Sequence, residues 1–493
     1  MSAGDLTVGL DLGTSSLKGV ALRPDGALVA RAQAPYATAR PGPGRAEQAP
    51  MDWVRAVQAV VAALAAQVPP RHWQAIGLSG MIPTLVALDA RGEPIGPAIT
   101  WEDGRAEAQG EGLRTRVGGA ALYARTGQWV DGRYLLPFAI WLREHEGEGR
   151  GRYVGLAGAK DWLFAWLTGA LATDPSTATG YGCFDLDAGA WDDETLAAAF
   201  GSARPALPEV RPSATLAPLS RGASVALGAP RGLPVCLGAA DSVLAARGLG
   251  VSAPGSVAYV AGTSTVILGV SHRQVRDPEH RYLVTPMDQP ASYGLEMDLL
   301  TTGSAVRWIA ELLGLPPGAE AAVWELAERS PRGADGLVLL PYLGPGEQGA
   351  LWDPSLRGTL VGATLAHTRA DLVRALLEGI TLESRRCVGV LDAAGIGRGG
   401  IVIAGPSAAA AVVRQALADA TGRLVRWPTA PDYPASAWGA AALAFEALGA
   451  EAPTPAGLDP GAQPDPDAAA AWGTLWDRHE RVRTATSGLW AVP

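Results

Sequence analysis

The stretch VGLDLGTSSLKGV, residues 8–20, constrains the fold of this chain more than any other part of the sequence. A strand-type apolar segment leads to Asp11, the next residues, Gly-Thr-Ser-Ser, form a short run rich in hydroxyls, and a second apolar segment begins at Leu17. This pattern predicts a β-hairpin with a small polar tip.

A tip of this kind is suited to binding a phosphate. Successive backbone N–H groups and the hydroxyls of Thr14 and Ser15 can point toward one anion. Asp11 beside the tip can hold Mg²⁺ through water, because this hard cation prefers carboxylate and phosphate oxygens. Lys18 adds a positive charge and is one of only two lysines in the chain. An ordinary hairpin with a Ser/Thr turn explains the same residues, and the stretch alone leaves both interpretations open.

The same pattern recurs in the second half of the chain. A predicted strand at residues 256–261 is followed by the turn Gly-Thr-Ser-Thr and by a second strand at residues 266–270. Thr263 and Ser264 occupy the places of Thr14 and Ser15. The repetition predicts a duplicated architecture of two α/β lobes with facing phosphate turns. Chance recurrence of a common turn is the alternative.

Composition limits the class of protein. A chain of 493 residues is too long for one core, so two large domains are expected. The net charge of −9 argues against a nucleic-acid partner and against an anionic membrane surface. The three cysteines lie far apart and form no CxxC pair, which indicates neither a zinc site nor a disulfide framework. With no targeting segment and no long apolar run, the sequence predicts a soluble cytoplasmic protein with no membrane partner.

Asp241 stands between a predicted strand at residues 233–237 and a predicted helix at residues 242–249. In open α/β sheets, ligands bind at the carboxyl ends of strands. An aspartate there can accept the proton of an attacking hydroxyl, as an aspartate does in protein-kinase phosphoryl transfer. A plain helix N-cap, which aspartate favours, is the alternative.

Other catalytic patterns are absent or lie in the wrong context. The glycine pattern GxGxxG at residues 395–400 follows a predicted helix and precedes a strand, whereas a dinucleotide-binding fold needs the reverse order. The sequence has no P-loop and no HExxH motif, and its six histidines form no triad-like pattern. These absences exclude P-loop and HExxH chemistry and give no support to a Ser-His-Asp hydrolase.

Further elements follow from apolar periodicity and turn signals. The residues Thr368 and Asp371 have the spacing of a capping box at a helix start. Residues 173–187, rich in glycine, serine and threonine, are expected to form a loop. The other predicted elements are helices at 52–68, 135–146, 159–167, 304–313, 368–386 and 408–420 and strands at 75–78, 84–88, 401–404 and 424–427.

Taken together, these segments resemble the FGGY family of carbohydrate kinases, and within it most closely the bacterial xylulokinases. The similarity extends from Val8 to about Leu448. The segments that carry it are residues 8–20, 77–89 (GLSG…LVALD), 101–105 (WEDGR), 159–185 (AKDWLFAWLTG…TDPS…FD), 238–241, 262–264 and 358–380.

The resemblance implies an α/β fold of two actin/hexokinase-like (ribonuclease H-like) lobes around a central cleft. Residues 1–246 would form the sugar-binding lobe with the first phosphate loop, and residues 247–493 the nucleotide-binding lobe. Asp241 would be the catalytic base and Asp11 would hold Mg²⁺ through water. The implied contacts are Thr14, Ser15, Lys18, Thr263 and Ser264 for the nucleotide phosphates, Gly303, Gly405 and Ser407 for the nucleotide, and Met81, Ile82, Pro83, Asp103, Arg105, Tyr134 and Asp241 for the sugar.

The implied activity is ATP-dependent phosphorylation of a hydroxyl of a pentulose such as D-xylulose, with ATP and Mg²⁺ required and a homodimer expected. Two alternatives remain. One is a kinase of the same family for another sugar or polyol, such as gluconate, ribulose or glycerol. The other is a non-catalytic actin-like protein that binds a sugar or a nucleotide.

Two departures from the family pattern bear on these alternatives. The xylulokinase sugar loop usually reads Gln-Met-His-Gly, and here it reads Met-Ile-Pro-Thr at residues 81–84. Replacing histidine by Pro83 removes a donor and an acceptor through which a site discriminates hydroxyls. The adenosine loop usually has three glycines and then alanine, and here Pro406 interrupts it. Proline lacks a backbone N–H and has a fixed φ, which changes what this loop can offer ATP.

Overall fold

The computed structural model describes residues 5–145, 152–316, 318–344, 349–353, 355–430, 432–455 and 457–489. By their contacts, the residues divide into two compact units. The first comprises residues 1–250, 283–293 and 434–455, and the second residues 251–282, 294–433 and 456–493. The division that the sequence suggested after residue 246 did not foresee the two later segments that join the first unit.

The first unit is built on a six-stranded sheet in the order β13-β14-β5-β1-β2-β3. β1 and β2 are antiparallel neighbours, which confirms the predicted opening hairpin, while β5 and β14 run parallel to β1. The bounds are β1 (Leu6–Leu12), β2 (Ser16–Leu22), β3 (Leu28–Pro35), β5 (Trp73–Gly80), β13 (Leu216–Pro218) and β14 (Pro234–Ala240).

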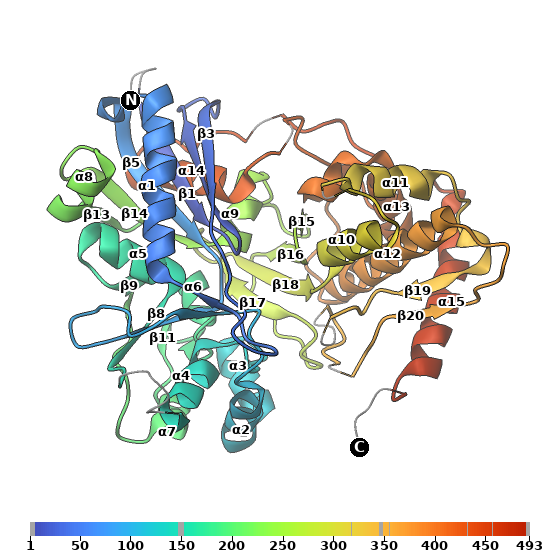
Figure 1. Ribbon diagram of the computed structural model, residues 1–493, viewed down its shortest axis with the longest axis horizontal. Coiled ribbons are helices and arrows are strands. Elements are labelled where there is room, and N and C mark those ends of the chain that lie inside the picture. Colours follow the sequence, from blue (N-terminus) through green and yellow to red (C-terminus); the bar gives the residue numbers. More distant parts are fainter. Residues whose placement is uncertain are drawn as a thin grey trace. The chain divides into compact units, whose positions relative to one another are not determined.

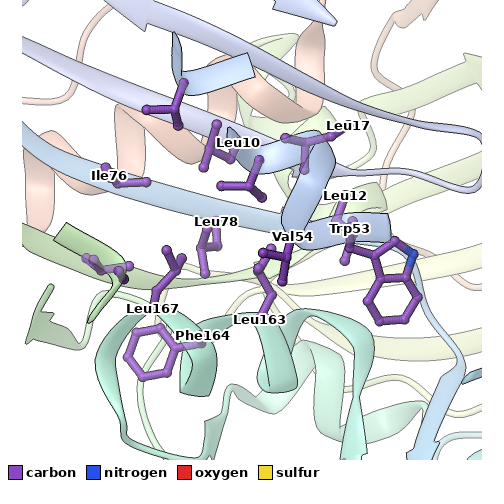
Figure 2. Packing of buried hydrophobic residues seen from close by; sticks show 14 of the residues in the cluster. Leu10, Leu12, Leu17, Trp53, Val54, Ile76, Leu78, Leu163, Phe164 and Leu167 are labelled. Atoms are coloured by element: carbon purple, nitrogen blue, oxygen red, sulfur yellow. The ribbon is translucent and has the colours of Figure 1, made fainter. Parts of the chain in front are cut away.

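One face of this sheet is covered by helices α1 (Pro50–Gln67) and α5 (Ala159–Thr168). Side chains of a strand alternate between the two faces, and Leu10 and Leu12 on this face pack in one apolar cluster with Trp53 and Phe164 of the two helices (Figure 2). Burial of each large apolar side chain contributes roughly 1.5–3 kcal/mol. This cluster therefore supports the strands whose ends carry Asp11 and residues 13–16.

The opposite face is covered by α14 (Ala435–Ala447), at very close range. A Cβ added at Gly9 of β1 would lie 1.9 Å from the carbonyl oxygen of Ala437, and one at Gly77 of β5 would lie 2.0 Å from that of Ala440. Only glycine in the strands allows the helix backbone to approach this closely. The contact explains why the segment 434–455 belongs to the first unit.

The rest of the first unit surrounds a four-stranded antiparallel sheet in the order β4-β7-β6-β8. Residues 173–187, expected to be a loop, contain the short helix α6 (Pro175–Thr179), the last residue of β9 and all of β10, so that prediction was partly wrong. The remaining elements are β4 (Glu47–Gln48), β6 (Thr84–Leu88), β7 (Ala98–Thr100), β8 (Gly155–Gly158), β9 (Ala172–Thr173), β10 (Phe184–Asp185), β11 (Ala190–Trp191), β12 (Glu209–Val210), β17 (Leu283–Pro286), η1 (Pro70–His72), α2 (Glu107–Val117), α3 (Gly119–Thr126), α4 (Leu135–Glu144), α7 (Asp193–Phe200), α8 (Arg221–Leu227) and α9 (Asp241–Gly248).

The second unit repeats the strand order of the first. Five neighbouring strands of its sheet run in the order β18-β16-β15-β21-β22, which corresponds strand by strand to β3-β2-β1-β5-β14. β15 and β16 are antiparallel and β21 is parallel to β15, as in the first sheet. The predicted second strand–turn–strand unit and the α/β class of both units are confirmed. The bounds are β15 (Val257–Ala261), β16 (Thr265–Ser271), β18 (Tyr293–Leu299), β21 (Ile401–Ala404) and β22 (Val425–Arg426).

Helix α12 (Arg369–Ala393) packs against α11, α13 and α15 in the second unit (Figure 1). Its predicted capping box is confirmed, because the Asp371 carboxylate accepts a hydrogen bond of 2.7 Å from the backbone N–H of Thr368. The other elements of this unit are α10 (Thr302–Leu312), α11 (Glu320–Glu328), α13 (Ala411–Thr421), α15 (Ala468–Thr486), η2 (Ala334–Gly336), η3 (Pro406–Ala409), β19 (Val338–Leu340) and β20 (Thr359–Val361).

Within the described ranges, the structure contains no helix with the length and apolar character that crossing a bilayer requires.

Candidate functional site

The carboxyl ends of three parallel strands meet at one edge of the first sheet. Leu12 at the end of β1 and Ala240 at the end of β14 are both paired with Gly80 at the end of β5. The backbone N–H of Met81 then donates to the carbonyl oxygen of Leu12 at 2.9 Å. Asp11, Met81 and Asp241, which the sequence places on three separate segments, therefore come to the same edge.

Asp11 is a buried carboxylate, with 7 % of its surface exposed. Its Oδ1 accepts a hydrogen bond of 2.8 Å from the Ser79 hydroxyl, and Lys18 is its cross-strand partner on β2. Burial raises the pKa of Asp11, although Lys18 and Ser79 act in the opposite direction. The raised pKa means that ionising this buried carboxylate costs free energy, and a nearby cation would reduce that cost.

No cluster of three or more metal-ligating side chains exists among the residues that the structure describes. Asp11 is a single buried carboxylate at the sheet edge. That arrangement fits Mg²⁺, which keeps several of its waters and often takes one or two carboxylates plus phosphate oxygens.

The first turn is closed by a hydrogen bond of 3.2 Å from the N–H of Gly13 to the carbonyl oxygen of Ser16. Thr14 is half-buried, whereas Ser15 and Lys18 are exposed. The exposed groups are therefore accessible to an anion, and the backbone that carries them is fixed within the first unit.

Three side chains that the sequence did not single out for this turn hold it in place. Tyr36 donates its hydroxyl to the carbonyl oxygen of Gly13, and Gln48 donates its amide to that of Thr14 at 2.7 Å. Trp101 donates its indole N–H to the hydroxyl oxygen of Thr14 at 3.1 Å. The Thr14 hydroxyl accepts this bond and can direct its own proton to another acceptor.

Asp241 is the first residue of α9 and is half-buried. The N-cap position is taken by Ala240, so the alternative interpretation of Asp241 as the N-cap is wrong. Its Oδ1 accepts the N–H of Ser242 at 2.9 Å, and its carbonyl oxygen accepts the hydroxyl of Ser436 on α14 at 3.1 Å. Two neighbouring elements of the first unit therefore fix the backbone of this aspartate.

The charges of Asp11 and Asp241 both affect the pKa of Tyr36. The pKa of Tyr36 is raised chiefly by burial, and further by the negative charges of Asp11 and Asp241. Tyr36, which also donates to the turn at Gly13, therefore lies in the field of both the candidate metal carboxylate and the candidate base.

The loop after β5 offers no polar side chain in its first three residues. Met81 is buried, Ile82 and Pro83 are half-buried, and the peptide bond between the latter two is cis. These residues lie next to Asp241 through the pairing of β5 with β14. Their predicted contact with a sugar stays a prediction.

The other three predicted sugar residues are engaged with the protein itself. Asp103 is fully buried and pairs with Arg105 at 2.6 Å, and Arg105 also pairs with Glu47 at 2.7 Å. Tyr134 donates its hydroxyl to Gln128 at 3.0 Å. These contacts account for the burial of the three side chains without a ligand, and their role in sugar binding stays untested.

In the second unit, the ends of β15 and β21 meet the start of α10. A Cβ added at Gly303 would lie 2.0 Å from the carbonyl oxygen of Gly262, and one at Gly405 would lie 2.1 Å from that of Ala261. The N–H of Ser304 donates to the carbonyl oxygen of Thr263 at 3.1 Å. Three of the segments predicted to bind the nucleotide therefore come together around the second turn.

Ser264 lies in that turn, where its carbonyl oxygen accepts the N–H of Gly262 at 2.8 Å. Ser407 lies in the 3₁₀ turn η3 (Pro406–Ala409), which delays the start of α13 to Ala411. The predicted helix start at residue 408 was therefore wrong, and the reason is the turn that begins with proline.

The functional candidates that sequence reasoning missed come from other segments of the fold. Tyr36 and Gln48 lie in a stretch rich in proline and glycine, which carries no periodic signal. Ser79 is one of several small residues in β5, and only the pairing of β1 with β5 brings it to Asp11.

Two domain models of one protein family match this chain. Residues 6–248 match the model of the N-terminal domain of the FGGY family of carbohydrate kinases, and residues 257–448 match the model of its C-terminal domain. A xylulose kinase of Klebsiella pneumoniae is 31% identical over 454 residues, which cover 92% of both chains. A gluconokinase of Bacillus subtilis (strain 168) is 28% identical over 392 residues, 76% of this chain and 74% of its own.

Among solved structures, the crystal structure of xylulose kinase from Rhodospirillum rubrum matches with a TM-score of 0.87 and 31% identity, over 99% of this chain and 100% of that one. The two domain models together span most of the sequence, in the order of the two sheets described above. This chain therefore belongs to the FGGY family of carbohydrate kinases, and it is a sugar kinase.

Proposed function

We propose that this sugar kinase transfers the γ-phosphoryl group of ATP to a hydroxyl of a pentulose such as D-xylulose, with Asp241 as the base. The observation that supports this most is the common sheet edge of Asp11, the turn at residues 13–16 and Asp241. A base, a cation ligand and a phosphate turn at one edge are the parts that phosphoryl transfer requires.

In the proposed reaction, the Asp241 carboxylate accepts the proton of the sugar hydroxyl. The hydroxyl oxygen forms a bond to the γ-phosphorus, and the bond from that phosphorus to the bridging oxygen of ADP breaks. The transition state is loose, so the protein contributes chiefly positioning and electrostatic stabilisation.

The residues of the two turns would hold the phosphates. Thr14 and Ser15 offer hydroxyl and backbone donors, and Lys18 offers a positive charge. In the second unit, Thr263 and Ser264 offer the corresponding donors. The close contact of the α10 start with the second turn supports a role for Gly303 in shaping that part of the nucleotide site.

We assign Asp11 as the residue that holds Mg²⁺ through water. A bound Mg²⁺ supplies positive charge that offsets the charge of the β- and γ-phosphates. The buried carboxylate of Asp11, with its raised pKa, fits that assignment, because a nearby cation compensates the cost of burying its charge.

Asp241→Asn tests the base. Asparagine keeps the shape of the side chain but cannot take a proton from the sugar, so turnover is expected to fall by at least about 100-fold. Sugar affinity, measured by calorimetry, is expected to stay within a few-fold. Asp193→Asn is the matched control, because Asp193 is the first residue of α7 as Asp241 is of α9. Turnover retained in Asp241→Asn would remove Asp241 from the role of base.

The identity of the sugar needs a test of its own, because the relatives include both a xylulose kinase and a gluconokinase. The apolar residues Met81, Ile82 and Pro83 beside Asp241 also offer no side-chain hydrogen bond to fix one hydroxyl pattern. A coupled assay of ADP release over D-xylulose, ribulose, gluconate and glycerol separates the candidates. The highest kcat/KM with D-xylulose supports the pentulose, and the highest value with gluconate transfers the assignment to that sugar acid.

A homodimer is expected from the family resemblance, and sedimentation of the purified protein measures it directly.

A further inference from the structure

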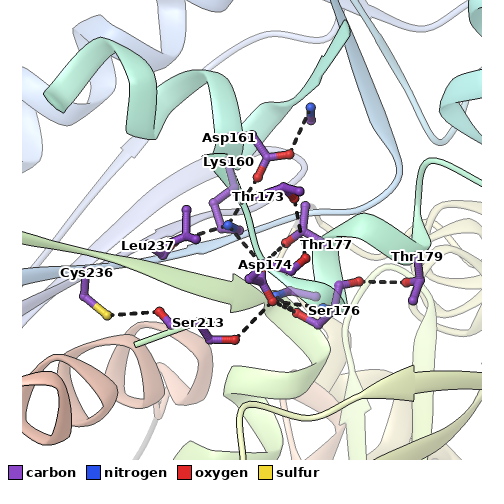
Figure 3. Close-up of polar contacts among 12 residues, drawn as sticks. Lys160, Asp161, Thr173, Asp174, Ser176, Thr177, Thr179, Ser213, Cys236 and Leu237 are labelled. Carbon is purple, nitrogen blue, oxygen red and sulfur yellow. Dashed lines mark hydrogen bonds and ion pairs between the residues drawn. The ribbon is translucent and has the colours of Figure 1, made fainter. Parts of the chain in front are cut away.

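Lys160 is the second lysine of the chain and is fully buried in the first unit. Its Nζ lies 3.3 Å from Oδ1 of Asp161 and 3.1 Å from Oδ1 of Asp174, both of which are also fully buried (Figure 3). Burying charged groups is costly even when they are paired. Apolar residues of similar size fill such a place at lower cost, so the presence of three charges calls for an explanation beyond packing.

Lys160 contacts strand β14 where the strand is irregular. Its Nζ donates to the carbonyl oxygen of Leu237 at 3.2 Å (Figure 3). Leu237 and Gly238 form a bulge, because the two lie between the residues that pair with Gly77 and Ser79 of β5. Gly238 has a φ of 75°, which glycine adopts readily. The lysine therefore fixes the backbone of β14 just before its end.

Asp174 extends the same network to the start of α9. Its Oδ2 accepts the backbone N–H of Ser176 at 3.0 Å and also the hydroxyl of Ser176. The oxygen of that hydroxyl in turn accepts the N–H of Ala240 at 2.9 Å. Ala240 is the N-cap of α9 and immediately precedes Asp241. A chain of polar contacts thus leads from the buried lysine to the residue beside the candidate base.

We propose that the network of Lys160, Asp174 and Ser176 positions the carboxylate of Asp241 for catalysis. This inference rests on the proposed function, in which Asp241 is the base. The three are positioning residues, since their contacts reach the backbone of β14 at Leu237 and Ala240, next to Asp241. Charged groups suit this task, because a charge-assisted hydrogen bond holds its partners more rigidly than a neutral one.

The network matters for rate because the base must lie within hydrogen-bond reach of the sugar hydroxyl. The side chain of Asp241 is oriented by the backbone torsions at Ala240 and Asp241. Displacement of a reacting group by about 1 Å can lower the rate about 100-fold. Loss of the acceptor for the Ala240 N–H is therefore expected to affect turnover more than binding.

Two variants of the same kind separate positioning from general stability. Ser176→Ala removes one hydroxyl donor to Oδ2 of Asp174 and also the acceptor of the Ala240 N–H. Ser213→Ala removes another hydroxyl donor to the same Oδ2, which it contacts at 3.2 Å. Ser213 contacts β14 through its carbonyl oxygen, which accepts the N–H of Gly238 at 2.9 Å and which alanine retains. Both serines are buried.

We expect Ser176→Ala to lower kcat at least about 10-fold while the KM values for sugar and ATP stay within about 3-fold. Ser213→Ala is expected to keep kcat within about 3-fold of the wild type. Thermal unfolding of both variants shows whether they lose comparable stability. Equal kcat in the two variants, or a loss of kcat that matches a loss of folded protein, would overturn the positioning role.

A double variant distinguishes failure of this inference from failure of the proposed function. If Ser176 acts through the Asp241 carboxylate, Ser176→Ala has no further effect on the residual rate of Asp241→Asn. Full activity of the single variant Asp241→Asn would show that Asp241 is not the base. Suppose instead that Asp241→Asn is inactive and Ser176→Ala behaves like Ser213→Ala. Asp241 would then keep its assignment as the base, and only the positioning role of the network would be rejected.

Discussion

At the scale of single residues, Gly303 and Gly405 have no room for a side chain. In each case the obstacle is a backbone carbonyl oxygen, which cannot rotate away as a side chain can. The second turn, the start of α10 and the end of β21 therefore tolerate almost no displacement relative to one another.

Gly303→Ala is expected to force the start of α10 away from Gly262 and to raise the KM for ATP about 10-fold or more, with a smaller effect on the KM for sugar. Steady-state kinetics with each substrate varied in turn measure both values. Gly389→Ala is the control, because Gly389 lies in α12 with no other atom within 4 Å of an added Cβ. Alanine there is expected to stabilise the protein by roughly 0.5–1 kcal/mol. An unchanged KM for ATP in Gly303→Ala would contradict a nucleotide site at this turn.

At this scale the sequence supplied candidates for the site. Thr14, Ser15 and Lys18 could be proposed because the chemistry of a tight turn is local, and the structure confirms the turn itself. Tyr36 and Gln48 could not, because their contacts with the turn depend on how a loop without periodicity folds back on the first sheet. Asp241 could be placed at a strand end, but its N-cap alternative could be rejected only from the backbone of Ala240.

At the scale of elements, the buried Lys160 joins α5 to the segment of α6 and to β14. Burial alone would lower the pKa of Lys160, but Asp174 and Asp161 raise it above the ordinary value, so the lysine stays charged. The two carboxylates depend on that charge, because each is fully buried.

Lys160→Met is therefore expected to destabilise the protein by roughly 3–5 kcal/mol, because it leaves buried carboxylates without their counter-charge. Arg71→Met is the control, because Arg71 is an exposed cation of η1 in the same unit. It is expected to change the free energy of unfolding by less than about 0.5 kcal/mol. Urea unfolding at neutral pH measures the free energy of unfolding of both variants. A Lys160→Met protein as stable as the wild type would contradict the importance of the buried charge.

Helices α12 and α15 are tied together by Glu383. Its carboxylate accepts hydrogen bonds from Tyr342 at 2.7 Å and Arg386 at 3.0 Å and contacts Nε2 of His479 at 2.6 Å. Burial would raise the pKa of Glu383, but His479 and Arg386 together lower it to about 2, from an ordinary value of 4.5. The charged carboxylate therefore stabilises the folded second unit.

Because this pKa is lower in the folded state, the stabilisation is complete above about pH 4.5 and is lost as the pH falls toward 2. We expect the free energy of unfolding of the wild type to fall between about pH 5 and 3 more steeply than that of Glu383→Gln. Glu325→Gln, at an exposed position of α11, is expected to keep the wild-type slope. If the free energy of unfolding falls with pH equally steeply in the wild type and in Glu383→Gln, this carboxylate does not stabilise the fold through its charge.

The sequence predicted several long helices but gave no prediction of α14. Apolar periodicity and capping signals placed α1, α5, α10 and α12, although α12 continues beyond its predicted end at residue 386. Helix α14, rich in alanine, is apolar on all sides, so its pattern gives no direction for packing. The structure shows that it packs on β1 and β5, where Gly9 and Gly77 have no side chain to block its backbone.

At the scale of the whole molecule, a repeated strand–turn–strand pattern was sufficient to predict two α/β units. The order of five strands is the same in both sheets, which the pattern alone could not show. The sequence also could not assign residues 283–293 and 434–455 to the first unit, because chain order does not reveal a return to an earlier sheet.

The central claim is that this family member transfers a phosphoryl group from ATP to a sugar hydroxyl. The most direct measurement is ³¹P NMR of the purified enzyme with ATP, Mg²⁺ and each sugar of the panel. We predict that, with one sugar, a phosphomonoester signal grows in step with ADP, and that Asp241→Asn abolishes both. Formation of ADP with inorganic phosphate alone, or of no ADP with any sugar, would contradict the account.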